Sequence, residues 1–309
     1  MAANKKARTN PPYELLYWPG IPGRGEFIRL AFEAAGVSYK DPANEEKDEQ
    51  SPIALTSHNL VLPKVIAVAE SLFCPNPPYV SRDYSRLEHK LTPTGVKAVT
   101  SLIDSSSTGT DGNPPPFAPP ALRIPSEGPS GKPLLLYQTP SILSYLGPKL
   151  DLAGTNEAEA QWILSHTLTA LDLNNEAHDT HHPIAVAKYY EDQKEESLKK
   201  ATDFREARIP KFLGFFERVL KGNGDQGKGK YLVGSKLSYA DTTLWQVLSG
   251  LLFAFPKEME ARKREFELLF GTFFESVKEE SGIKEYLASD RRKPFSMGVF
   301  RHYPELDRQ

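Results

Sequence analysis

Apolar positions recur with a helical period at both ends of the first half of the chain. The segment Glu26–Ala35 is amphipathic and stops at Gly36, and glycine commonly follows the last turn of a helix. The segment Pro140–Leu150 begins with a proline, which suits a first helical turn. Its apolar face is formed by Ile142, Leu143 and Leu146. We expect one helix over each segment.

Shorter apolar segments elsewhere in this half lack a helical period. The segments 113–124 and 132–139 are bounded by prolines and glycines and predict short strands. An alternating run at residues 13–17, "YELLY", predicts another strand, which opens into the Pro/Gly-rich turn "PGIPGRG". The first half of the chain therefore mixes strands with helices.

From Asn156 onward the pattern is helical throughout. The segment 156–179 predicts one long helix, and the positions expected to be buried are Trp162, Leu164, Leu168 and Leu171. Pro210 is expected to bend or start the helix that follows it. That helix has an apolar stripe formed by Phe212, Phe216, Val219 and Leu220.

The most apolar segment of the chain, residues 235–255, is expected to form the core of this second half. Ser238 and Asp241 have the spacing of a capping box, in which a hydroxyl and a carboxylate satisfy two end amides of a helix reciprocally. A mixed first half and a helical second half predict an α/β domain followed by an all-helical domain.

Prolines mark an insertion in the first domain. Seventeen of the 26 prolines lie between Pro42 and Pro148, which excludes long helices there. Residues 43–116 show no sustained period, so we expect a Pro-rich insertion with a short helix around 84–91 and some disorder. The predicted organisation is a flexible tail at 1–11, an α/β domain at 12–148 and an all-helical domain at 149–309.

Composition and charge narrow the class of protein. Lys and Arg number 38 against 40 Asp and Glu, a balance that argues against nucleic acid or an anionic membrane as the main partner. No apolar run has the length of a membrane span, and the basic N-terminus lacks the apolar core of a secretory signal. A single cysteine, Cys74, excludes an internal disulfide framework and is interpreted as a surface thiol. We expect a soluble, cytoplasmic protein.

Four motifs occur in an order that resembles the cytosolic glutathione transferase superfamily. They are "YELLYWPGIPGRGEFIRL", "PPALRI", "YQTPSILSYL" and "YLVGSKLSYADTTLWQVL". The stretches "EAHDTHHPIAVAKYYEDQ" and "PFSMGVFRHYPELD" are typical of a less-studied microbial branch with a catalytic tyrosine. The resemblance implies a thioredoxin-like first domain and a homodimer that joins glutathione, as co-substrate, to a small hydrophobic electrophile.

The resemblance also implies roles for particular residues. The Tyr17 hydroxyl would donate a hydrogen bond to the glutathione sulfur, which favours the thiolate; as a sequence feature alone, Tyr17 is equally an aromatic that ends a strand. Gln138 and Thr139 would hold the γ-glutamyl end at the start of a helix. Arg24 would orient the loop or act on the sulfur through its charge, with a plain surface arginine as the alternative.

One position departs from the family pattern. Pro120 matches the cis-proline of the family, followed by Ala121, and the residue before it normally offers both N–H and C=O to glutathione. That residue is here Pro119, which has no N–H. Half of the backbone contact is then lost, unless the cis bond is Ala118–Pro119 and the register shifts.

Several residues have more than one interpretation. His178, His181 and His182 have helical spacing and are candidates for a metal site, for capping or packing at a helix end, or for the second-substrate pocket. Trp18 and His166 either line that pocket or belong to the core. The function itself has an alternative, a non-catalytic ligand-binding or scaffolding protein on the same fold.

Overall fold

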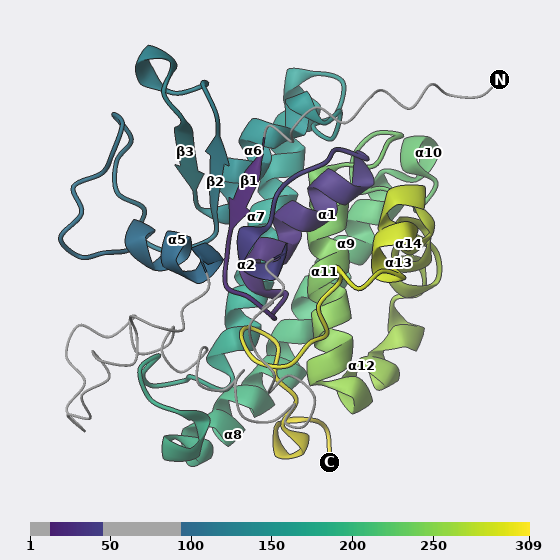
Figure 1. Ribbon diagram of the computed structural model, residues 1–309. Coiled ribbons are helices and arrows are strands. Elements are labelled where there is room, and N and C mark those ends of the chain that lie inside the picture. Colours follow the sequence, from purple (N-terminus) through teal and green to yellow (C-terminus); the bar gives the residue numbers. More distant parts are fainter. Residues whose placement is uncertain (1–12, 46–93) are drawn as a thin grey trace.

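A small antiparallel sheet lies beside a larger group of helices (Figure 1). The computed structural model describes residues 13–45 and 94–309. The strands β1 (Glu14–Leu16), β2 (Ala121–Ile124) and β3 (Leu134–Tyr137) pair in that order, with Leu122 opposite both Leu15 and Leu136. On the other edge of β1, Leu15 donates its N–H to the Lys40 carbonyl at 2.8 Å in a single parallel bridge.

The predicted helices of the first domain are present. They are α1 (Glu26–Ala34) and α6 (Thr139–Lys149), which pack against each other, and α6 also contacts β2 and β3. The two later strands are shorter than predicted because a proline-rich loop occupies residues 113–120 and the α6 helix already begins at Thr139. Sheet and helices together form a thioredoxin-like domain.

The region predicted as an insertion contains a helix that the sequence analysis missed. Helix α5 (Thr94–Leu102) packs on β1 and on the short α2 (Pro42–Glu45). Its apolar positions Val96, Val99 and Leu102 are spaced three apart and are buried. Nine residues between a proline and polar loops are too few for this period to be evident. The short helix expected around 84–91, Cys74 and the tail at 1–11 lie outside the described residues.

The second domain is helical, as predicted. Its helices are α7 (Glu157–Asp179), α8 (Lys194–Asp203), α9 (Ile209–Gly222), α10 (Gly224–Gly227), α11 (Tyr239–Ala254), α12 (Pro256–Arg262), α13 (Phe274–Glu279) and α14 (Ser281–Leu287). Two π-helical turns, η4 (Phe204–Arg208) and η6 (Leu268–Phe273), precede α9 and α13. Short 3₁₀ turns occur in both domains. The first domain contains η1 (Gly23–Gly25) and η2 (Pro129–Gly131), and the second contains η3 (Tyr190–Asp192), η5 (Lys263–Glu265) and η7 (Pro304–Leu306).

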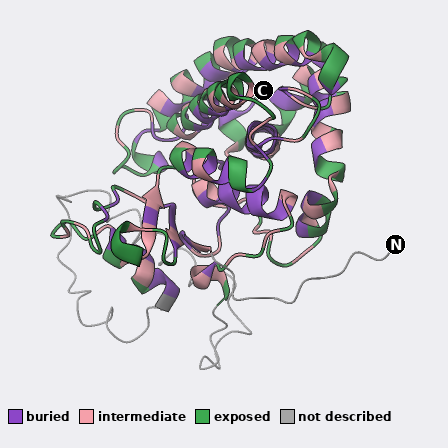
Figure 2. Cartoon of the chain, turned by 90° about the horizontal axis from the view of Figure 1, so that it is seen from above, coloured by how far each residue is buried: buried purple, intermediate pink, exposed green. Residues whose placement is uncertain are grey.

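Helix α11 is the core of this domain, as its apolar sequence predicts. It packs against α1, α7, α12 and α13, and buried segments occupy the interior of the chain while the outer helices present exposed faces (Figure 2). The Ser238–Asp241 capping box is confirmed, and Asp241 also accepts the Leu232 N–H at 2.8 Å. Burial raises the pKa of Asp241 to about 7, although these hydrogen bonds favour its charged form.

The predicted buried face of α7 is wrong in part. Leu171 is buried, but Trp162 and Leu168 are 57% and 44% exposed. The helix instead turns a mixed face toward the core, in which the apolar Ile163 and Leu173 alternate with small or polar residues, namely Thr167, Ala170, Asn174 and Ala177. Thr167 tolerates burial because its hydroxyl donates to the Ile163 carbonyl at 2.8 Å. The prediction missed this face because it followed the bulky Trp162 and Leu168 and passed over the small and polar residues that are buried beside Ile163 and Leu173.

The α9 prediction holds, since Phe212, Phe216 and Leu220 are buried and Pro210 occupies its first turn. Val219 on the same stripe is half-buried. Within the described ranges, no helix combines the length and the hydropathy needed to cross a membrane.

Candidate functional site

Tyr17 directly follows β1 and lies beneath the turn η1. Its side chain is 5% exposed, and its phenol oxygen accepts the backbone N–H of Arg24 at 2.8 Å. A Cβ atom at Gly23 or Gly25 would overlap the hydroxyl or the ring of Tyr17, so only glycine lets the turn lie flat on the ring. Burial raises the pKa of the phenol, partly offset by the nearby Arg24 charge. The hydroxyl is therefore a neutral proton donor at physiological pH.

Tyr17 borders a cleft of about 490 Å³ between the two domains. The first wall is the loop after β1, and the second is formed by residues 117–120 together with Gln138 and Thr139. The third comes from the last turns of α7 and from residues 298–301 near the C-terminus. Such a volume lies within the usual range of small-molecule binding sites.

Most of the predicted site residues meet in this cleft. They are Tyr17, Trp18, Arg24, Pro120, Gln138 and Thr139. Ala121 does not line it, because it is fully buried within β2 between Leu16 and Tyr137. His166 does not line it either, since it lies about three helical turns before His178 on α7 and packs against Phe215 at 5.8 Å.

Pro119 occupies the position at which the backbone was expected to pair with a ligand. The cis bond is Pro119–Pro120, as the motif predicts, and the alternative at Ala118–Pro119 does not apply. Pro119 lines the cleft and has a carbonyl there but no N–H to donate. The expected loss of half of a backbone pair with a ligand remains a prediction.

Gln138 and Thr139 lie at the start of α6. Gln138 has a φ of 68° and precedes the first helical residue, and Thr139 is 3% exposed. The Thr139 hydroxyl contacts the Arg24 carbonyl at 3.5 Å, which joins the helix start to the loop that covers Tyr17. The unpaired amides and partial positive charge of a helix N-terminus suit a carboxylate ligand.

The Arg24 side chain crosses from the first domain to the second. Its Nη2 donates to Oδ1 of Asn175 on α7 at 2.9 Å, and both residues line the cleft. Arg24 is thus fixed at two points, by its backbone at Tyr17 and by its guanidinium at α7. These contacts favour the interpretation that it orients the loop over that of a plain surface arginine.

The three histidines pack together at the end of α7, with ring centroids 4.8 to 5.1 Å apart. His181 Nε2 donates to the Val299 carbonyl and His182 Nδ1 donates to the Lys188 carbonyl, each at 3.0 Å. Burial lowers the pKa of His181 to about 2 and that of His182 to about 4, so both are neutral donors. Among the described residues, no group of three or more His, Cys, Asp or Glu side chains is arranged to hold a metal ion.

The geometry instead supports packing at a helix end, with His178 and His182 also bordering the cleft. The other residues of this wall were not predicted from the sequence; they are Asn175, Asp179, Val186, Gly298, Val299 and Arg301. The signal that the sequence offered is the i, i+3, i+4 spacing of Asn175, His178 and Asp179, which places them on one face of α7.

Comparisons with known proteins agree with this architecture. Residues 178–290 match the family model of the glutathione S-transferase C-terminal domain. Glutathione S-transferase P 1 of Xenopus laevis is 32% identical over 51% of this chain and 65% of its own length. Rat glutathione S-transferase alpha-3 is 35% identical over 37% of this chain and 45% of its own length. The matched segments thus span less than two thirds of either relative.

A solved structure extends the likeness to nearly the whole fold. The sigma class GST of Fasciola hepatica has a TM-score of 0.54 at 18% identity and covers 92% of this chain and 97% of its own. At that identity the likeness concerns the fold alone. The C-terminal domain match and the sequence relatives support the cytosolic glutathione transferase superfamily for this chain, and the solved structure agrees in fold.

Proposed function

We propose that the protein conjugates glutathione to small electrophilic compounds. The observation that carries this proposal is the Tyr17 hydroxyl, a neutral donor whose oxygen already accepts the Arg24 N–H and whose own proton is available to a ligand in the cleft. A free thiol has a pKa near ~8.5, so little thiolate is present at neutral pH. A hydrogen bond from Tyr17 to the sulfur favours the thiolate and lowers that pKa.

The rest of the cleft supports binding of the tripeptide. The γ-glutamyl carboxylate fits the start of α6, where Gln138 adds an amide and Thr139 a hydroxyl. The Pro119 carbonyl is left to accept the cysteinyl N–H of the ligand. In the reaction, the thiol proton leaves to solvent and Tyr17 holds the thiolate. The sulfur then forms a bond to an electrophilic carbon, and the leaving group departs with its electron pair.

Other residues around the cleft indicate the character of the second substrate. Trp18, Phe117 and Val186 offer apolar surface, while His178 and His182 offer ring nitrogens. A small hydrophobic electrophile with one hydrogen-bonding group matches this combination. This adds one hydrogen-bonding group to the small hydrophobic electrophile expected from the sequence.

We also propose that the protein acts as a homodimer. Trp162 and Leu168, both on α7, are 57% and 44% exposed. Their exposure on one helix is consistent with a surface that another protein covers, although single exposed apolar residues do not by themselves mark an interface. Light scattering of the purified protein tests this proposal, and a cytoplasmic location remains a prediction of the sequence.

The test of the function is retention on immobilised glutathione, followed by turnover with a generic aryl halide. We expect both for the natural sequence, and retention with strongly reduced turnover at neutral pH for Tyr17→Phe. A folded protein that neither binds nor turns over glutathione would contradict the proposal.

The second candidate function is a non-catalytic ligand-binding protein, and Pro119 is the observation that favours it. The missing N–H weakens the backbone pairing on which glutathione binding depends. This candidate predicts that glutathione binds weakly in calorimetry and that no electrophile is consumed. Measurable turnover with any electrophile would exclude it.

A further inference from the structure

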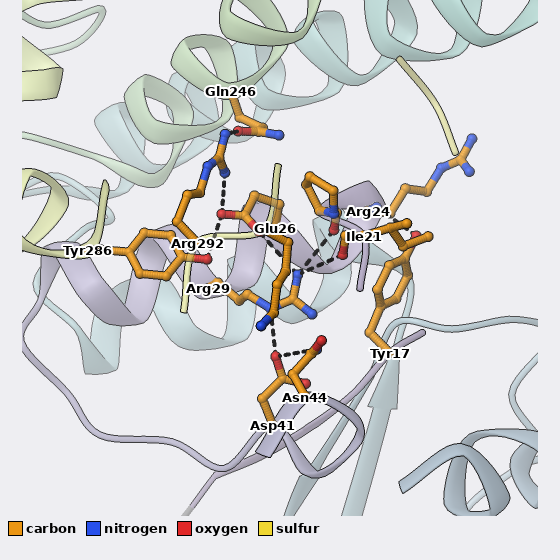
Figure 3. A network of polar contacts seen from close by, with 12 residues as sticks. Tyr17, Ile21, Arg24, Glu26, Arg29, Asp41, Asn44, Gln246, Tyr286 and Arg292 are labelled. Carbon is orange, nitrogen blue, oxygen red and sulfur yellow. Dashed lines mark hydrogen bonds and ion pairs between the residues drawn. The ribbon is translucent and has the colours of Figure 1, made fainter. Parts of the chain in front are cut away.

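The loop that covers Tyr17 is held by a buried arginine on α1. Arg29 is 1% exposed, and its Nη1 donates to the Pro22 carbonyl at 3.1 Å and to the Ile21 carbonyl at 3.5 Å. Its guanidinium carbon lies 5.8 Å from the centre of the Tyr17 ring (Figure 3). One side chain thus contacts both the loop and the residue beneath it.

Arg29 is also connected to the loop indirectly, through the side chains of Asp41 and Asn44. Its Nε donates to Oδ2 of Asp41 at 2.8 Å, and that oxygen also accepts from Asn44 Nδ2 at 2.9 Å. Asn44 Oδ1 in turn accepts the Gly20 N–H at 2.9 Å. We call Arg29, Asp41 and Asn44 the loop clamp, because the Arg29 and Asn44 side chains bond the backbone of residues 20, 21 and 22 and Asp41 joins the two side chains.

The loop clamp is connected to the far end of the chain through Glu26. Glu26 is fully buried; its Oε2 pairs with Arg29 at 3.1 Å, and its Oε1 accepts the Tyr286 hydroxyl at 2.8 Å. Arg292 pairs with the same Oε1 and donates to Gln246 of α11 at 2.9 Å. Burial raises the pKa of Glu26, but the charges of Arg292 and Arg29 outweigh it and lower the pKa overall. The carboxylate is therefore charged and links two cations.

We propose that Arg29 is a positioning residue that sets the Tyr17 hydroxyl through the loop clamp, and that Arg292 supports it from the second domain. The clamp fixes residues 20–22, which directly precede the Gly23–Gly25 turn that bonds Tyr17. Arg292 acts at a distance, since it contacts Glu26, α11 and the Phe295 ring and does not line the cleft. The catalytic consequence rests on the proposed function, whereas the mechanical coupling does not.

The test uses the full chain with three variants. Arg29→Lys keeps the charge but loses the fork that bonds both Asp41 and the loop. Arg292→Gln removes the distal cation while Arg29 stays in place. Arg291→Gln is the matched control, because Arg291 is the neighbouring arginine and pairs with α1 at Glu33. Circular dichroism and thermal melting establish that each variant is folded, and Asn44→Ala replaces Arg29→Lys if the latter does not fold.

The first readout is hydrogen exchange of residues 18–25 in the ligand-free protein, which needs no glutathione. We expect exchange to accelerate about tenfold or more in Arg29→Lys and several-fold in Arg292→Gln, and to stay unchanged in Arg291→Gln. Unchanged exchange in a folded Arg29→Lys would overturn the loop clamp. Equal acceleration in Arg292→Gln and Arg291→Gln would overturn the role of Arg292.

The second readout is saturated turnover with glutathione as a function of pH. A positioning role predicts lower turnover in Arg29→Lys and a higher apparent pKa of the bound thiol, with a smaller change in half-saturation. Faster exchange with unchanged turnover and pH profile would overturn the action on Tyr17. If the natural protein shows no turnover, the proposed function fails. In that case a spectrophotometric titration of the Tyr17 phenol replaces this readout, with the Tyr17→Phe protein as the reference that is subtracted. A Tyr17 pKa in Arg29→Lys identical to that of the natural protein would overturn the proposal.

Discussion

The backbone N–H of Arg24 donates a 2.8 Å hydrogen bond to the phenol oxygen of Tyr17, and glycines on both sides of Arg24 make this approach possible. A phenol oxygen that accepts a backbone N–H becomes a better donor through its own proton, because hydrogen bonds in a chain polarise one another. The "GRG" sequence therefore not only forms a turn but also allows the hydrogen bond that polarises the Tyr17 hydroxyl. It also connects the hydroxyl to every contact that holds the loop.

Removal of the Tyr17 hydroxyl tests the proposed role directly. In Tyr17→Phe the ring still fills its space beneath the turn, so we expect little change in stability. We expect turnover at neutral pH to fall about ten- to a hundredfold, which corresponds to roughly 1.4–2.7 kcal/mol. The deficit should shrink at higher pH, where the thiol ionises unaided. Tyr13→Phe, at the other end of β1, is the matched control. Full activity with an unshifted pH profile in Tyr17→Phe would show that Tyr17 has only a packing role.

Loss of the Gln138 amide should weaken glutathione binding more than it slows turnover. A hydrogen bond to a charged group contributes about 1.5–3 kcal/mol, so Gln138→Ala should raise the half-saturation constant by roughly ten- to a hundredfold. Because the φ of Gln138 is 68°, alanine also introduces backbone strain. Gln138→Gly relieves that strain, and equal loss of binding in both variants assigns the effect to the amide. Calorimetry with unchanged affinity would show that Gln138 does not touch the ligand.

Replacement of Pro119 by valine should strengthen glutathione binding. Pro119→Val restores a backbone N–H at the edge of the cleft, and one such hydrogen bond contributes about 0.5–1.5 kcal/mol, or up to roughly tenfold in affinity. Titration calorimetry of the folded variant measures the gain. An affinity no better than that of the natural sequence would mean that the ligand pairs with the backbone elsewhere.

Stability should decrease as the pH falls below about 6.5, because of His181 and, down to about pH 4, also because of His182. The unfolded chain protonates His181 near pH ~6.5, whereas burial keeps its pKa at about 2 in the folded protein. Between these values only the unfolded state gains the proton, so each pH unit removes about 1.4 kcal/mol of stability. Urea unfolding at pH 7 and pH 5 measures this loss, and carboxylates add to it at lower pH.

His181→Gln separates the histidine from the other groups that titrate. The variant loses stability at pH 7, since the packed ring and its bond to Val299 are gone, but its unfolding free energy should vary less between pH 7 and pH 5. Parallel pH dependences of the two proteins would contradict the assignment to His181.

Much of the candidate site was predictable because it is encoded in short stretches. Tyr17, Arg24, Pro120, Gln138 and Thr139 lie at strand ends, turns and helix starts, where neighbouring glycines and prolines mark the backbone. His166 was misplaced for a related reason. Spacing along α7 fixes which residues share a face but does not say how far along the helix the cleft begins.

The sequence by itself determined the elements whose causes are local. The start of α6 at a proline, the end of α1 before Gly36 and the Ser238–Asp241 box depend on residues within a few positions of one another. Only the tertiary structure decided which face of α7 is buried and which residues close the cleft. The bond between Glu26 and Arg292 joins residues 266 positions apart. Its existence depends on how α1 and α14 pack, because no local period or capping rule records a contact over such a distance.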